Sequence, residues 1–194
     1  MPTQTFILAS ASARRRELLA QLGARFEIHP AEIEEPRDKP AELSLLAWVE
    51  ALAYYKARAV AGAHPDRWIL GADTIVVCHG ALMGKPADID EARAMLERQA
   101  RYPSEVITGV AFVRGGAQNS RVFRHDATRI WMRDESELRE RYLAGGEWQG
   151  KAGAYGIQDI GDILVARRDG SLSNVVGLPV ELAEPVLKRL GLLN

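Results

Sequence analysis

Length, composition and charge narrow the classes of protein to which this chain can belong. Its 194 residues are 47% hydrophobic and 26% charged, as expected of a globular protein with one full core. The net charge of -1 excludes a broad nucleic-acid surface, because such surfaces carry excess positive charge. The single cysteine, Cys78, excludes an internal disulfide. With no evident secretory signal or membrane-length apolar run, we expect a cytoplasmic protein with no membrane partner, and a single domain over 1–194.

Short apolar segments alternate with amphipathic ones along the chain, which is typical of an α/β fold. The clearest turn is at Gly115 and Gly116, and the apolar segments on both sides of it predict an antiparallel hairpin. We therefore expect a mixed β-sheet rather than a purely parallel one. The predicted strands are 5–9, 69–78, 105–114 and 121–132, and the predicted helices are 13–22, 41–61, 88–100, 134–144 and 179–190.

The first strand leads directly into a helix that begins with three arginines. Ser12 is a suitable N-cap for this helix, and Gly23 is a suitable stop. The free N–H groups of a helix start favour an anion, and arginine adds forked donors that match phosphate oxygens. Arg14 and Arg15 share the apolar side of the predicted helix and should border a cleft, whereas Arg16 projects elsewhere. The alternative is a basic, solvated first turn.

An acidic, proline-rich loop is predicted at residues 30–40. Glu32, Glu34 and Glu35 crowd this loop, and carboxylate oxygens are the ligands that hard divalent cations prefer. The alternative is that these side chains are only solvated, because a run of charge specifies function weakly.

A lysine interrupts the apolar stripe of the second predicted helix. Lys56 falls in line with Leu45, Val49, Leu52 and Ala59, at a position where an apolar residue is expected. Either its methylene groups carry the ammonium to the edge of the protein, or the ammonium emerges in a cleft and meets an anion.

Asp73 is the strongest catalytic candidate because it interrupts an apolar strand, two residues after Gly71, with Thr74 beside it. A buried carboxylate needs a metal ion, a lysine or N–H donors to offset its desolvation, and all three occur in hydrolytic sites. The alternative is a structural aspartate that caps a turn. Lys85 follows in a Gly-Lys-Pro turn that suits a phosphate contact, although an ordinary surface lysine would have the same pattern.

Two later segments carry polar groups among small residues. Gln158 ends a glycine- and alanine-rich segment, and its amide has both the donor and the acceptor needed to pair with a pyrimidine edge. The polar turn at 170–179 either closes the site or only caps the last helix.

Taken in order, these motifs resemble the Maf family of nucleoside triphosphate pyrophosphatases, and the resemblance runs nearly end to end. It implies a long mixed sheet flanked by helices, with two lobes around a central cleft. Two departures are Ala13, where the family usually has proline, and Ser104, where histidine is frequent. The motifs are SASARR at 10–15, GADT at 71–74, GKP at 84–86, VITGV at 106–110, KAGAYGIQ at 151–158 and NVVGLP at 174–179.

The resemblance also implies roles for individual residues. Asp73 matches the catalytic carboxylate, which acts as a general base toward water or through a divalent cation, magnesium or manganese. Glu35 matches the family's glutamate near the metal, so Glu35 and Asp73 form the implied metal set. The implied substrate-binding residues are Ser10, Arg14, Arg15, Lys56, Thr74, Lys85 and Gln158.

Within the family, Arg14, Thr74 and Gln158 resemble the group that acts on dTTP and UTP. The implied reaction is attack of water on the α-phosphorus, which leaves a nucleoside monophosphate and pyrophosphate. The alternatives are a non-catalytic nucleotide sensor or cell-division regulator, and a pyrophosphatase for 7-methyl-GTP or ITP. The oligomeric state stays open, and a homodimer is one option.

Overall fold

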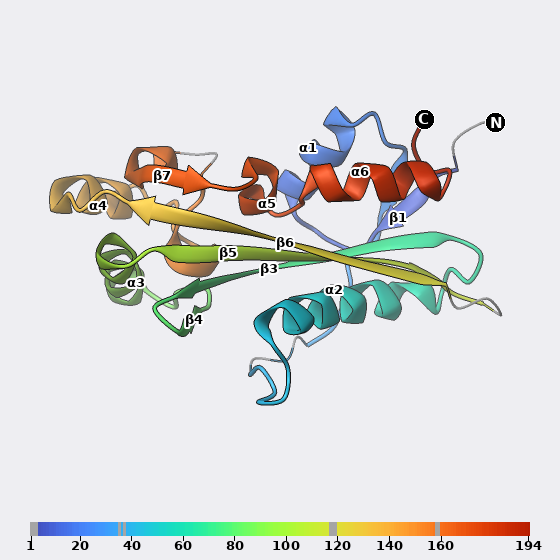
Figure 1. Cartoon of the computed structure of the whole chain (residues 1–194), viewed down its shortest axis with the longest axis horizontal. Helices are drawn as coiled ribbons and strands as arrows, with labels where there is room; N and C mark the ends of the chain where they lie inside the picture. Colours follow the sequence, from blue (N-terminus) through green and yellow to red (C-terminus); the bar gives the residue numbers. More distant parts are fainter. Residues whose placement is uncertain (1–3, 35, 37, 117–119, 158–159) are drawn as a thin grey trace. The chain divides into compact units, whose positions relative to one another are not determined.

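The computed structural model describes residues 4–34, 36, 38–116, 120–157 and 160–194, and its elements alternate as an α/β fold requires (Figure 1). The strands are β1 Phe6–Leu8, β2 Phe26–Ile28, β3 Trp68–Cys78, β4 Ala81–Met83, β5 Ser104–Arg114, β6 Arg121–Met132 and β7 Val165–Asp169. The α-helices are α1 Ala13–Gln21, α2 Leu45–Ala61, α3 Ile89–Arg101, α4 Ser136–Ala144, α5 Leu172–Val176 and α6 Val180–Arg189, with short 3-10 helices η1 Ala152–Ala154 and η2 Ile160–Leu164.

The strands form one seven-stranded sheet in the order β2-β1-β3-β5-β6-β7, with β4 paired to β3. The pairs β1·β2 and β1·β3 are parallel, whereas β3·β4 and β6·β7 are antiparallel. The predicted mixed sheet is therefore confirmed. β2, β4 and β7 are additional strands that the apolar pattern did not predict.

The chain divides into two compact units. Unit 1 comprises Met1–Asp73, Thr108–Asp126 and Gly177–Asn194, and unit 2 comprises Thr74–Ile107 and Ala127–Val176. The strands β3, β5 and β6 each contribute residues to both units. The predicted cleft and the single-domain assignment stay predictions.

In unit 1, α2 lies on one side of the sheet, and α1 and α6 lie on the other (Figure 1). The α2 side is packed with small residues, because the backbone of the helix lies almost on the strands. A Cβ atom at Gly71 would lie 2.8 Å from the backbone nitrogen of Ala57, and one at Gly109 would lie 2.6 Å from the carbonyl oxygen of Val49. The core cluster under α2 comprises Ile7, Ala9, Ala53, Ala57, Ala61, Ile69, Ala111 and Val113.

The buried face of α2 differs from the predicted stripe at one position. Ala59 is exposed, whereas Ala57 and Ala61 are buried. The face therefore turns toward the two strand glycines, which accept only small helix residues. The helix also begins later than predicted, at Leu45, because the hydroxyl of Ser44 accepts a hydrogen bond from Ala47 N and caps it.

The first turn of α1 confirms the predicted capping. Ser12 is the N-cap, and its Oγ accepts a hydrogen bond from Arg15 N. The helix ends at Gln21, and Gly23 provides the predicted stop just beyond it, with a φ of 73° and its N–H donated to Ala20 O.

Among the described residues, no helix combines the length and apolarity needed to cross a membrane.

Cys78 closes β3 and is fully buried, and burial raises the pKa of its thiol. We expect iodoacetamide to leave this residue unmodified in the native protein at neutral pH and to modify it rapidly in urea, because the thiolate is the reactive form. Mass spectrometry of the alkylated chain measures this, and rapid modification without denaturant would contradict the packing of β3.

Candidate active site

Two predicted site residues lie at the same edge of unit 1 because their strands are parallel neighbours. Leu8 of β1 is in register with Leu70 of β3, and Ala9 N donates to Leu70 O at 2.8 Å. Ser10 comes two residues after Leu8, just beyond the end of β1. Asp73 comes three residues after Leu70, within β3. Ligands of open α/β sheets bind beyond the carboxyl ends of parallel strands, so this edge is the candidate active site.

Asp73 forms a buried ion pair with Lys56. The Nζ atom of Lys56, on α2, lies 2.5 Å from Oδ1 of Asp73, and each side chain is only 12% exposed. Of the three compensations considered for the carboxylate, the structure therefore provides the lysine. The pairing depends on Gly71, because the same closeness of helix and strand that excludes a Cβ there brings Lys56 to Asp73.

Replacing Lys56 by methionine should destabilise the protein by about 3 kcal/mol, because it leaves a carboxylate buried without its counter-ion. Adding Asp73→Asn to Lys56→Met should recover part of that loss. Urea titration measures both effects. The matched control is Lys188→Met, which breaks an exposed pair with Glu184 and should change stability by less than about 1 kcal/mol. Equal effects of the two lysine variants would contradict a buried pair.

The three arginines of α1 differ in their surroundings. Arg16 is exposed, as predicted, whereas Arg14 and Arg15 are half-buried. Arg15 donates from Nε to Gly177 O at 2.8 Å and from Nη1 to Ser10 Oγ at 3.0 Å. Arg14 makes no such contact within the described part of the chain. The two neighbouring arginines therefore differ, because Arg15 is hydrogen-bonded to other parts of unit 1 and Arg14 is not hydrogen-bonded to the described residues.

Unit 2 brings two of the predicted binding segments together. Gly153 N donates to Gly84 O at 3.0 Å, which holds the turn that carries Lys85 against the segment at 151–157. Lys85 itself is exposed and lacks a protein partner among the described residues. Thr74 is half-buried on β3. Gln158, the predicted base reader, lies outside the described residues.

Gln99 is a supporting residue that the sequence reasoning missed. It is 1% exposed on α3, and its Nε2 atom donates to Gly153 O at 2.7 Å and to Met95 O at 3.3 Å. The signal was available, because Gln99 continues the buried spacing of Ala92 and Leu96 on this helix.

Asn174 explains the polar turn at 170–179. It is fully buried, and its Nδ2 atom donates to Val106 O and to Thr128 Oγ1, each at 2.9 Å. It therefore ties the turn to β5 and β6 inside unit 2. Capping of the last helix, the other interpretation, does not apply, because α6 begins at Val180 without a side-chain cap.

Tyr155 lies in the predicted binding segment at 151–158. Its ring is buried, and burial, together with the nearby Tyr142 phenol, raises the pKa of its hydroxyl. The phenol therefore stays neutral at physiological pH, and Tyr155 serves to pack the 151–157 segment.

The predicted metal set is only partly described. Glu35 lies outside the described residues, so Asp73 is the one implied ligand whose position is known. The described residues contain no group of three or more His, Cys, Asp or Glu side chains that could hold a metal ion. Asp73 nonetheless offers a hard oxygen donor, because Lys56 contacts its Oδ1 and leaves Oδ2 without a hydrogen bond from the described residues.

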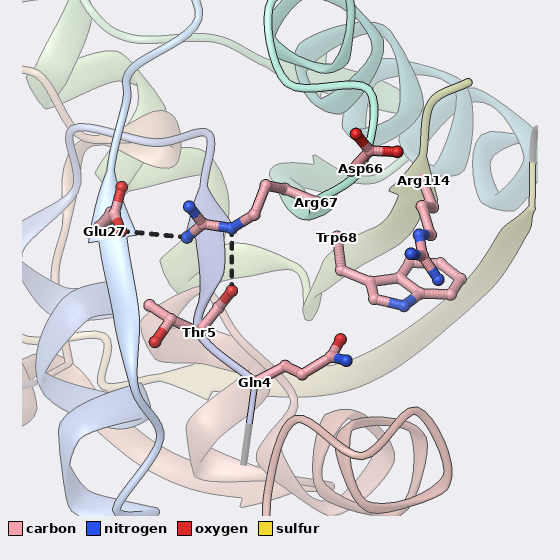
Figure 2. A pocket seen from close by; sticks show the side chains of 7 residues that line it. All are labelled: Gln4, Thr5, Glu27, Asp66, Arg67, Trp68 and Arg114. Carbon is pink, nitrogen blue, oxygen red and sulfur yellow. Dashed lines mark hydrogen bonds and ion pairs between the residues drawn. The ribbon is translucent and has the colours of Figure 1, made fainter. Parts of the chain in front are cut away.

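A pocket of about 370 Å³ lies elsewhere in unit 1, at the amino ends of β1 and β3 (Figure 2). Arg67 donates to Thr5 O and to Glu27, and this arginine lowers the pKa of the Glu27 carboxyl. The two arginines and two acidic residues of the lining balance in charge, and no predicted site residue belongs to it. The lining residues are Gln4, Thr5, Glu27, Asp66, Arg67, Trp68 and Arg114.

The fold and the carboxylate–ammonium pair together define an α/β protein with a candidate hydrolytic site. The same fold occurs in a solved structure of a HAM1 protein from Coxiella burnetii. That structure matches with a TM-score of 0.54 at 16% identity, over 95% of this chain and 98% of the other.

Sequence comparison gives the family. The model of the family described as Maf-like protein matches residues 5–190. A dTTP/UTP pyrophosphatase of Pelotomaculum thermopropionicum is 43% identical over 95% of this chain and 96% of its own length. One of Myxococcus xanthus is 46% identical over 96% and 92%, respectively. This chain belongs to the Maf family.

Proposed function

We propose that this protein hydrolyses dTTP and UTP to the corresponding monophosphate and pyrophosphate. The observation that carries the proposal is the buried Asp73–Lys56 pair on β3, just beyond the residues of β3 that pair with β1, in a chain that belongs to the Maf family. Relatives that are 43% and 46% identical over nearly their whole length are named dTTP/UTP pyrophosphatases, which supports the choice of substrates.

Asp73 is the proposed catalytic residue. Water attacks the α-phosphorus, the bond from that phosphorus to the bridging oxygen breaks, and pyrophosphate leaves with the bond's electron pair. The carboxylate of Asp73 takes the proton that the attacking water loses. Lys56 keeps that carboxylate oriented, and an ammonium carries three donors, so it can contact a phosphate oxygen while it holds Asp73 Oδ1.

Three further cations and donors are proposed to bind the triphosphate. Arg14 offers a forked guanidinium, Lys85 a compact ammonium, and Ser10 a hydroxyl. The positive charges of Arg14 and Lys85 offset the charge that develops on the phosphate oxygens as the bond breaks, and the Ser10 hydroxyl donates a hydrogen bond to one of them. Thr74 and Gln158 are proposed, with Arg14, to select the pyrimidine nucleotide.

A divalent cation fits this donor set. Magnesium is usually held by one or two carboxylates, with waters and substrate phosphates completing its shell, so Asp73 and Glu35 suffice when the ion arrives on the nucleotide. When bound, magnesium or manganese would supply charge stabilisation to the phosphate oxygens and activate the attacking water.

The test is pyrophosphate release from a panel of dTTP, UTP, CTP, ATP, GTP, ITP and 7-methyl-GTP, each with magnesium, with manganese and with chelator. Cation-dependent release that prefers dTTP and UTP is the expected result. A preference for ITP or 7-methyl-GTP would overturn the substrate assignment, and nucleotide binding without release would instead support a sensor.

A further inference from the structure

We infer that Arg15 is a positioning residue, which orients the hydroxyl of Ser10 toward a phosphate oxygen instead of contacting the phosphate itself. The inference rests on the proposed function, because it takes the ligand to be the triphosphate of a nucleotide. It assigns different tasks to two neighbouring arginines that the sequence pattern treats alike.

The hydrogen bonds around Ser10 carry the first step. A hydroxyl oxygen has two acceptor lone pairs and one proton to donate. Ser10 Oγ accepts from Arg15 Nη1 at 3.0 Å and from Ser12 N at 3.3 Å, so two N–H groups occupy both acceptor positions. The O–H group must therefore donate, and within the described part of the chain it has no acceptor. Ser10 is only 9% exposed, so this nearly buried O–H group is available to donate to a ligand at the candidate site.

The contacts of Arg15 carry the second step. Its Nε atom donates to Gly177 O, 162 residues further along the chain. This bond and the bond from Nη1 to Ser10 Oγ together hold the guanidinium in place, so Nη1 stays directed at Ser10. The α1 backbone completes the arrangement, because Arg15 N donates to Ser12 Oγ at 3.4 Å. Arg15 thus joins the end of β1, the start of α1 and the residue that leads into α6.

The chemistry of this arrangement favours an anion as the ligand of Ser10. A donor-only hydroxyl suits a phosphate oxygen, which is an acceptor only, and a charge-assisted bond of this kind is among the stronger hydrogen bonds in proteins. Without Arg15, the Ser10 hydroxyl regains an acceptor position, so it is no longer held as a donor only. The cost appears as weaker phosphate binding, although no charge touching the phosphate has been removed.

The test is a double-mutant cycle on the binding of inorganic tripolyphosphate, measured by titration calorimetry with the full chain. Ser10→Ala and Arg15→Gln should each weaken binding about tenfold, and the double variant should be no weaker than about tenfold, because both remove the same interaction. Arg15→Lys should not rescue binding, because one ammonium cannot reproduce the fixed fork between Ser10 and Gly177. Arg16→Gln, the same charge change on the exposed neighbour, should leave binding unchanged.

Independent losses that multiply to about a hundredfold in the double variant would overturn the inference, because they would mean that Arg15 contacts the phosphate. Near-complete rescue by Arg15→Lys would overturn it as well. Should Arg15→Gln fail to fold, the cycle with Arg15→Lys decides the question. Wild-type protein that does not bind tripolyphosphate also overturns the inference, whereas binding without cleavage of dTTP or UTP overturns only the proposed function.

Discussion

Asp73→Asn should lower kcat for dTTP by about a thousandfold while nucleotide binding persists. The amide is nearly the same size as the carboxylate and can still accept a hydrogen bond from Lys56, so the site keeps its shape. It cannot take a proton from water and is a poorer metal ligand. Removing a negative charge beside the triphosphate should also keep the nucleotide bound as tightly as before or more tightly. Pyrophosphate release measures kcat, and calorimetry with an α,β-methylene analogue of dTTP measures binding.

The matched control for this substitution is Asp66→Asn. Asp66 lines the pocket at the amino ends of β1 and β3, and it is exposed, so the same chemical change there should leave kcat within about twofold. Turnover by Asp73→Asn within tenfold of wild type would remove Asp73 from the mechanism.

Gly71→Ala should destabilise the protein by about 3 kcal/mol and lower Tm by about 9 °C. The added methyl would lie 2.8 Å from the backbone nitrogen of Ala57, and backbone cannot move aside as a side chain can. The helix α2 must then separate from β3, which also spoils the Lys56–Asp73 pair. We therefore expect kcat to fall even at temperatures where the variant is folded. Calorimetric unfolding and pyrophosphate release measure the two effects.

Gly62→Ala is the control for the added methyl. Gly62 ends α2 with a φ of -62°, and a Cβ there meets nothing within 4 Å. Alanine suits this backbone and should change stability by less than about 0.5 kcal/mol, or raise it slightly. An equal loss at both glycines would mean that the close approach of α2 to β3 is not what makes Gly71 necessary.

The long elements of the fold were predictable because their patterns are strong. The strands β3, β5 and β6 begin and end within one residue of their predicted bounds. β3 and β5 are long and mostly apolar, and β6 follows β5 across the clear turn at Gly115 and Gly116. In contrast, β2 and β7 are short and largely exposed, so they have no apolar run to reveal them. Their strand character comes from pairing with a neighbouring strand, which a local pattern does not contain.

The candidate site was predictable residue by residue but not as an arrangement. Lys56 and Asp73 each stood out as a polar residue in an apolar pattern, yet their pairing depends on how closely Gly71 lets α2 approach β3. The local spacing of Arg14 and Arg15 did not separate their surroundings, because the residue that binds only Arg15, Gly177, lies 162 residues away from it. The residue types therefore indicated which groups could bind or hydrolyse a phosphate, whereas the partner of each group depends on tertiary contacts that the sequence pattern does not contain.

The measurement that tests the central claim most directly is hydrolysis of dTTP in water labelled with oxygen-18, followed by mass spectrometry of both products. Attack on the α-phosphorus predicts one labelled oxygen in dTMP and none in the pyrophosphate. Label in the pyrophosphate, or release of dTDP and orthophosphate, would contradict a pyrophosphatase that acts at the α-phosphorus.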